Sequence, residues 1–170
     1  VKDFVTANGG NIYGLTLGDM VWDRYWVDNK YSFAEYIEEM KPVAGLPFFH
    51  TPGNHDHDLW ESGDFATMAK YKQNIGPSYY SYNLGKVHGV VLDDIDCANP
   101  GTGKNATYTN NLVQEQLDWL KKDLSHVSKD TPIIVSMHAQ MFANPGTGQT
   151  PNYAMTASSA SQLEDILDDF

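Results

Sequence analysis

Cysteine and basic residues are both scarce in this sequence. Its 170 residues include one cysteine, Cys97, so neither an internal disulfide nor a zinc site built from several cysteines can form. We interpret Cys97 as a small buried hydrophobic residue, because the neighbouring sequence offers it no partner histidine. Eleven Lys and Arg residues stand against 22 Asp and Glu residues, giving a net charge of −11. This balance disfavours general nucleic-acid binding and binding to anionic membrane surfaces.

Long apolar runs are also absent, and no segment approaches the ~18 residues of a membrane span. Hydrophobic residues make up 41% of the chain and charged residues 19%, a composition typical of a folded protein with a packed core. The length suits one domain.

The two ends of the sequence predict an internal piece of a longer protein. Residues 1–4 (VKDF) contain no Met and no signal-peptide pattern, and the last residues lie within a predicted helix. We therefore expect flanking domains in the same chain.

Strand-like and helix-like segments alternate along the chain, which favours a layered α/β fold. Strands are predicted at 11–17, 46–50 and 131–137, the first and last of them buried, and a hairpin at 79–84 and 86–93. Helices are predicted after the capping box Ser32 to Glu35, at 64–74, at 112–124, and after a second capping box, Ser161 to Glu164.

Three of the predicted strands end in side chains able to bind metal. Asp19 follows the first strand, Asn54 and His55 follow the second, and His138 ends the last. Taken alone, Asp19 is more typical of a turn or helix cap, residues 54–56 are equally consistent with a polar loop, and His138 is equally consistent with a satisfied core histidine. Because ligand sites in open α/β sheets lie beyond the carboxyl ends of strands, we expect the side chains of Asp19, Asn54 and His138 to converge.

Other polar segments carry weaker signals. His55 and His57 begin a pattern like the H-x-H-x-D-H of metallo-β-lactamases, but Leu59 and Trp60 replace its last two residues. We therefore interpret His57 as exposed or as a support for a neighbouring ligand. Asp93, Asp94 and Asp96 (residues 93–96, DDID) are interpreted as a solvated strand end, with acid/base machinery or a cation site as the alternatives.

The ordered motifs resemble those of the calcineurin-like metallophosphoesterases. Residues 17–23 (LGDMVWD), 53–56 (GNHD) and 137–138 (MH) carry the resemblance. Residues 79–97 and 116–142 are similar to bacterial multidomain members of that superfamily, which favours a periplasmic or cell-envelope location.

The resemblance implies an incomplete four-layer αββα sandwich with two divalent metal ions, of Mn, Fe or Zn. It implies that Asp19 bridges the ions, that Asn54 and His138 bind the second ion, and that His55 is the general acid. Residues that could support the ligands or line a pocket are Trp22, Asp23, Tyr25, Asp56 and His57.

The sequence also departs from the family pattern. The first motif, D-x-H, and the last, G-H-x-H, are absent, so the 170-residue piece alone is expected to be inactive. Purple acid phosphatases carry a Tyr three residues after the bridging Asp, where this chain has Trp22.

The resulting hypothesis is metal-dependent hydrolysis of a small phosphate ester. One alternative is a cell-surface domain with a degenerate metal motif that binds carbohydrate or another ligand through Trp22, Tyr25, Trp26 and the loop at 99–111. The other is a structural remnant without activity.

Overall fold

The computed structural model describes residues 2–8, 12–21, 31–97, 107–143 and 153–170. The helices are α1 (Lys2–Asn8), α2 (Phe33–Met40), α3 (Asp64–Thr67), α4 (Ala69–Asn74), α5 (Gln114–Leu124) and α6 (Ala157–Asp169), with short 3₁₀ turns at η2 (Lys41–Val43) and η3 (Asn54–Asp56). The strands are β1 (Gly14–Leu17), β2 (Phe48–Thr51), β3 (Tyr80–Leu84), β4 (Val87–Val91), β5 (Ile95–Asp96), β6 (Thr109–Asn110) and β7 (Ile133–Ser136). The fold is mixed α/β, as the sequence predicts.

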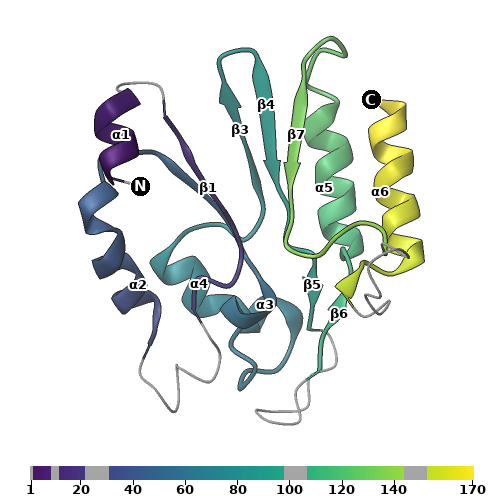
Figure 1. Cartoon of the computed structure of the whole chain (residues 1–170). Coiled ribbons are helices and arrows are strands. Elements are labelled where there is room, and N and C mark those ends of the chain that lie inside the picture. Colours follow the sequence, from purple (N-terminus) through teal and green to yellow (C-terminus); the bar gives the residue numbers. More distant parts are fainter. Residues whose placement is uncertain (1, 9–11, 22–30, 98–106, 144–152) are drawn as a thin grey trace.

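The strands form three small sheets near the middle of the molecule (Figure 1). β1 pairs with β2 in parallel, and β4 lies between β3, its antiparallel partner, and β7, its parallel partner. β5 and β6 form a short antiparallel pair. In the two parallel pairs the chain leaves both strands at the same edge of the sheet, and the candidate site residues follow at these edges.

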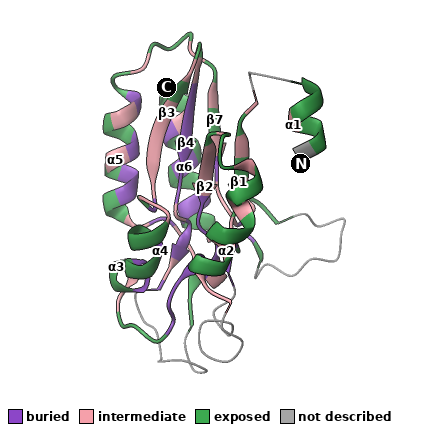
Figure 2. Cartoon of the chain, turned by 90° about the vertical axis from the view of Figure 1, so that its left-hand side faces the viewer, coloured by how far each residue is buried: buried purple, intermediate pink, exposed green. Residues whose placement is uncertain are grey.

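The main core lies between β4 and the two longest helices. Leu117, Leu120 and Leu124 form the buried stripe of α5, and Leu163 and Ile166 of α6 pack into the same cluster. β4 is buried along most of its length, whereas α1 is largely exposed (Figure 2). The predicted helix at 112–124 is therefore confirmed as α5, and its buried face covers the strand that leads to the aspartates at 93–96.

A second, smaller core joins the first motif to helices α2 and α4. Met20 and Val21 pack with Phe33, Met68 and Tyr71, and the rings of Phe33 and Tyr71 meet edge to face at 5.8 Å. This cluster anchors the chain immediately after Asp19.

Local capping signals are partly confirmed. Ser32 and Glu35 form the predicted capping box of α2. The predicted start of the last helix at Ser161 is wrong, because the Thr156 hydroxyl accepts the Ser159 N–H and begins α6 one turn earlier. The predicted helix at 64–74 divides into α3 and α4 at Met68.

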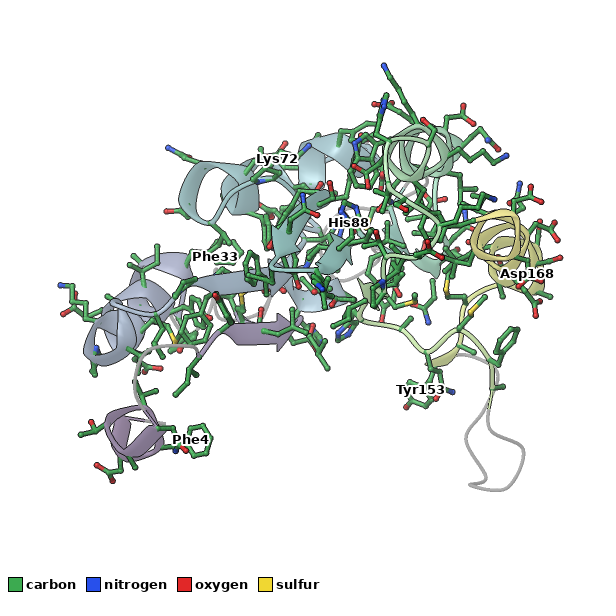
Figure 3. All side chains as sticks on the ribbon, turned by 90° about the horizontal axis from the view of Figure 1, so that it is seen from above. Phe4, Phe33, Lys72, His88, Tyr153 and Asp168 are labelled. Atoms are coloured by element: carbon green, nitrogen blue, oxygen red, sulfur yellow. The ribbon has the colours of Figure 1, made fainter. Side chains whose placement is uncertain are left out.

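The first and last strands were predicted to be buried, and this is wrong for one face of each. Leu15, Leu17 and Ile134 keep 44%, 59% and 50% of their surface exposed. The apolar runs predict strands correctly, but side chains alternate between faces, and the described residues leave these faces open to solvent. Seen from above, Phe4 and Tyr153 also lie at the periphery (Figure 3).

The part of the chain that the structure describes includes no helix with the length and apolar character needed to cross a membrane.

We predict that Leu120→Ala lowers the free energy of unfolding by about 2–5 kcal/mol, because it leaves a cavity beneath α5 where Leu120 is fully buried. Ile37→Ala, at a position that is 40% exposed on α2, is the control and should change the free energy by about 1 kcal/mol or less. Urea denaturation of both variants measures the difference, and equal losses would contradict the assigned core.

Candidate active site

The carboxyl ends of β1 and β2 bring the first two motifs side by side. The register pairs Leu17 with Thr51, so Asp19 and Asn54 follow neighbouring strand ends. The two loops touch closely, because a Cβ added to Gly53 would lie 2.5 Å from both the backbone N and Oδ1 of Asp19. Only glycine permits this approach at position 53.

The backbone at the end of β1 turns sharply. Gly18 has φ of +96°, and Asp19 is the one non-glycine residue described with positive φ, at +58°. Aspartate tolerates this left-handed conformation better than most residues, although it remains less favourable than the right-handed form. Unfavourable backbone conformations of this kind gather at functional sites, where the surrounding structure maintains them.

The buried carboxylate of Asp56 maintains the turn. Its Oδ2 accepts the backbone N–H groups of Asp19 and Gly53, each at 2.8 Å, and its Oδ1 accepts that of Val21 at 3.0 Å. Burial raises the pKa of Asp56 to about 6, the backbone donors of Gly53 and Val21 oppose this, and the Asp19 carboxylate adds to it. Asp56 was predicted to support the ligands or line a pocket, and the structure shows it joining the two loops.

Asp94, which follows β4, has the same role in the β3–β4–β7 sheet. Its carboxylate accepts the backbone N–H groups of His138 at 3.1 Å and Ala139 at 2.7 Å, and the side chain is fully buried. Burial raises the pKa of Asp94 to about 6 against the lowering effect of these two hydrogen bonds. The interpretation of residues 93–96 as a solvated strand end is therefore wrong at Asp94, which fixes the backbone that carries His138.

His138, Asn54 and Asp19 lie together at the meeting point of these loops. His138 Nε2 lies 3.0 Å from Asn54 Oδ1 and 3.6 Å from Asp19 Oδ2. Its other ring nitrogen, Nδ1, lies 2.7 Å from the Leu17 carbonyl oxygen. A carbonyl only accepts hydrogen bonds, so Nδ1 carries a proton, and in the neutral ring Nε2 presents a lone pair to the other two residues.

His55 lies beside this group. Its backbone N–H donates to Asp19 Oδ1 at 3.1 Å, and the residue is partly buried within η3. The backbone of His55, which directly follows Asn54, is thus in contact with the carboxylate of Asp19.

His57 is not exposed, contrary to one of the two predictions for it. The side chain is completely buried; Nδ1 lies 2.7 Å from Thr67 Oγ1 and Nε2 lies 3.2 Å from Asp93 Oδ1.

Cys97 is buried as predicted, but its sulfur lies 3.5 Å from His57 Nδ1. The absence of a nearby histidine in sequence was misleading, because the fold brings one from 40 residues away.

Three predicted pocket residues, Trp22, Asp23 and Tyr25, lie outside the described residues, as does Trp26. Conversely, sequence reasoning missed the roles of Asp94 and of the Leu17 carbonyl. The only available signal for Asp94 was a carboxylate directly after an apolar strand, which is also typical of solvated strand ends.

Comparison with known proteins identifies the family of this chain. The family model for calcineurin-like phosphoesterase matches residues 3–169, nearly the whole sequence. The chain belongs to the calcineurin-like phosphoesterase family. This confirms the resemblance drawn from the motifs, and the mixed α/β structure is consistent with that family's fold.

A curated relative is purple acid phosphatase 15 of Arabidopsis thaliana, which is 26% identical over 156 residues. The alignment covers 86% of this chain and 24% of the relative, so the chain spans about a quarter of that protein's length. Trp22, the position that departs from the purple acid phosphatase pattern, is outside the described residues.

We predict that Gly53→Ala lowers the free energy of unfolding by about 1–3 kcal/mol, because the new Cβ would press against the backbone and carboxylate of Asp19. Gly45→Ala is the matched control: its Cβ would meet nothing within 4 Å, and its expected change is about 0.5 kcal/mol or less. Denaturant titration compares the two, and a neutral Gly53→Ala would contradict the close approach of the loops.

Proposed function

We propose that this chain carries a metal-dependent phosphoesterase centre at Asp19, Asn54 and His138. The observation that supports it is a convergence of acceptors: the carboxylate oxygen of Asp19, the amide oxygen of Asn54 and the lone pair of His138 Nε2 face one another. With the Nδ1 proton directed to Leu17, the neutral arrangement has no proton between these atoms. A divalent cation satisfies all three.

The donor set fits such an ion. Carboxylate and amide oxygens with an imidazole suit Mn, Fe or Zn. A metal-binding histidine commonly donates its second ring N–H to a backbone carbonyl, as His138 does to Leu17. The donors therefore have both the composition and the orientation of a metal site.

A two-metal centre requires more than these three residues. In our proposal Asp19 would help to hold two ions, and Asn54 and His138 would help to hold one of them. Of the residues assigned here, only Asp19 reaches the other ion, and its remaining ligands would come from the D-x-H and G-H-x-H motifs that this sequence lacks. For this reason we propose that the 170 residues alone are poorly active, and that flanking parts of a longer chain complete the centre.

The chemistry follows from the positions of the residues. When bound, the metal ions supply Lewis-acid stabilisation of the phosphoryl oxygens and a nucleophilic hydroxide at neutral pH. Asp19, Asn54 and His138 hold the ions, and the loops fixed by Asp56 and Asp94 orient these ligands. His55 would protonate the leaving oxygen of the ester, because it directly follows Asn54 in the chain and a histidine can transfer protons near neutral pH.

We propose a small phosphate ester as the substrate. The net charge of −11 repels long polyanions and disfavours a nuclease. The alternative of a carbohydrate-binding domain depends on Trp22, Tyr25 and Trp26, and no described contact favours it.

We predict that His55→Ala, made in the full protein, lowers the turnover of an alkyl phosphate by about 10²–10⁴-fold while the metal content is unchanged. The reason is that His55 provides a proton and is not a ligand. The loss should be smaller for an aryl phosphate with a good leaving group, which leaves without protonation. Steady-state kinetics and elemental analysis measure both effects.

His126→Ala is the matched control, because His126 is exposed on the segment that precedes β7, whereas His138 follows the other end of that strand. Its turnover and metal content should equal those of the unmodified protein. Loss of metal in His55→Ala would contradict the role of proton donor.

A further inference from the structure

A second group of metal-binding side chains shares no residue with the group of Asp19, Asn54 and His138. His57, Asp64 and Cys97 offer a ring nitrogen, a carboxylate oxygen and a sulfur that lie within 4.8 Å of one another. They come from the chain after η3, the first turn of α3 and the residue after β5. His57 and Cys97 are completely buried, so these donors face the interior of the protein.

The surroundings of His57 resemble those of a histidine bound to zinc. Metal-binding histidines commonly donate the second ring N–H to a carboxylate, which fixes the ring and makes the other nitrogen a better donor. Nε2 of His57 lies 3.2 Å from Asp93 Oδ1 in this way, and Nδ1 faces both Thr67 Oγ1 at 2.7 Å and Cys97 Sγ at 3.5 Å. The ring is thus already oriented with Nδ1 toward the sulfur.

The distance between the donor atoms also fits a tetrahedral zinc site. Zn–N and Zn–S bonds at a tetrahedral angle place their two ligand atoms about 3.6 Å apart. The observed separation between His57 Nδ1 and Cys97 Sγ is 3.5 Å. The carboxylate of Asp64 already accepts the backbone N–H of Cys97 at 2.8 Å, which keeps it against the same segment.

The local charge favours a cation. The Asp93 carboxylate lies 3.2 Å from His57 Nε2, and the Asp64 carboxylate accepts the backbone N–H of Cys97, so anionic oxygens adjoin the group from two segments. The charges of Asp93 and Asp96 both act on the Asp64 carboxylate. Because this interior is rich in anionic groups, a divalent ion is electrostatically favoured.

We propose that His57, Asp64 and Cys97 form a structural zinc site, distinct from the phosphoesterase centre. The mixture of thiolate, imidazole and carboxylate selects a borderline ion such as Zn²⁺ over Mg²⁺ or Ca²⁺, which prefer oxygen ligands alone. Water or the Thr67 hydroxyl takes the fourth position. Binding releases the thiol proton of Cys97 and the Nδ1 proton of His57 to solvent, so the affinity falls as the pH is lowered. The ion would tie the loop after η3 to α3 and to the end of β5.

Cobalt provides a selective test, since a thiolate bound to Co²⁺ gives a charge-transfer band that oxygen and nitrogen ligands do not give. Cys97 is the single cysteine of the 170 residues, so the band reports this group alone. We predict that Co²⁺ added to the chelator-treated chain produces the band and that Zn²⁺ removes it by displacement. Asp64→Asn should weaken Co²⁺ binding at least tenfold, and Asp93→Asn about 10–100-fold.

Asp19→Asn is the matched control, because it alters the phosphoesterase centre and should leave the band and its affinity unchanged. Circular dichroism establishes that each variant is folded. The proposal is overturned if the folded, unmodified chain gives no band, or if Asp64→Asn and Asp93→Asn both bind Co²⁺ as tightly as the unmodified chain. Cys97→Ser abolishes the band if the sulfur is the ligand, and persistence of the band in this variant also overturns the proposal.

Discussion

The candidate site depends on the buried carboxylate of Asp56, which accepts three backbone N–H groups. It joins the turn after β1, through Asp19 and Val21, to the turn after β2, through Gly53. Without an acceptor at this position, buried backbone donors would be left unpaired at a cost of about 1–3 kcal/mol each. The unfavourable left-handed backbone of Asp19 would also lose the contact that holds it.

A buried carboxylate also fixes a loop of the second sheet. Asp94 accepts the N–H groups of His138 and Ala139, so a buried carboxylate fixes the loop after β7 as Asp56 fixes the loops after β1 and β2. The two sheets then meet where His138 reaches across to the carbonyl of Leu17. The ligands that we propose are therefore held by backbone hydrogen bonds, and their side chains are left to face one another.

Much of this site could be predicted from the sequence, because its signals are local. Asp19, Asn54 and His138 can be recognised because each is a polar residue that follows an apolar strand, and parallel strands bring such ends together. The capping box of α2 is equally local, since Ser32 and Glu35 satisfy each other within one turn.

The remaining features depend on contacts between distant segments. Asp94 has the same sequence context as a solvated aspartate, and only the loop after β7 makes it a buried acceptor. The pairing of His57 with Cys97 joins residues 40 positions apart. The exposure of Leu15 and Leu17 could not be inferred either, because an apolar run does not state which face of a strand is covered.

The most direct test of the central claim is a crystal structure of the metal-loaded full protein with anomalous scattering measured at the metal edge. Our account predicts an anomalous peak within about 2.0–2.2 Å of Asn54 Oδ1, His138 Nε2 and one carboxylate oxygen of Asp19, with His138 Nδ1 still directed to the Leu17 carbonyl. A metal-loaded protein whose ions lie elsewhere, with His138 and Asn54 in contact with each other and with no ion, would contradict it.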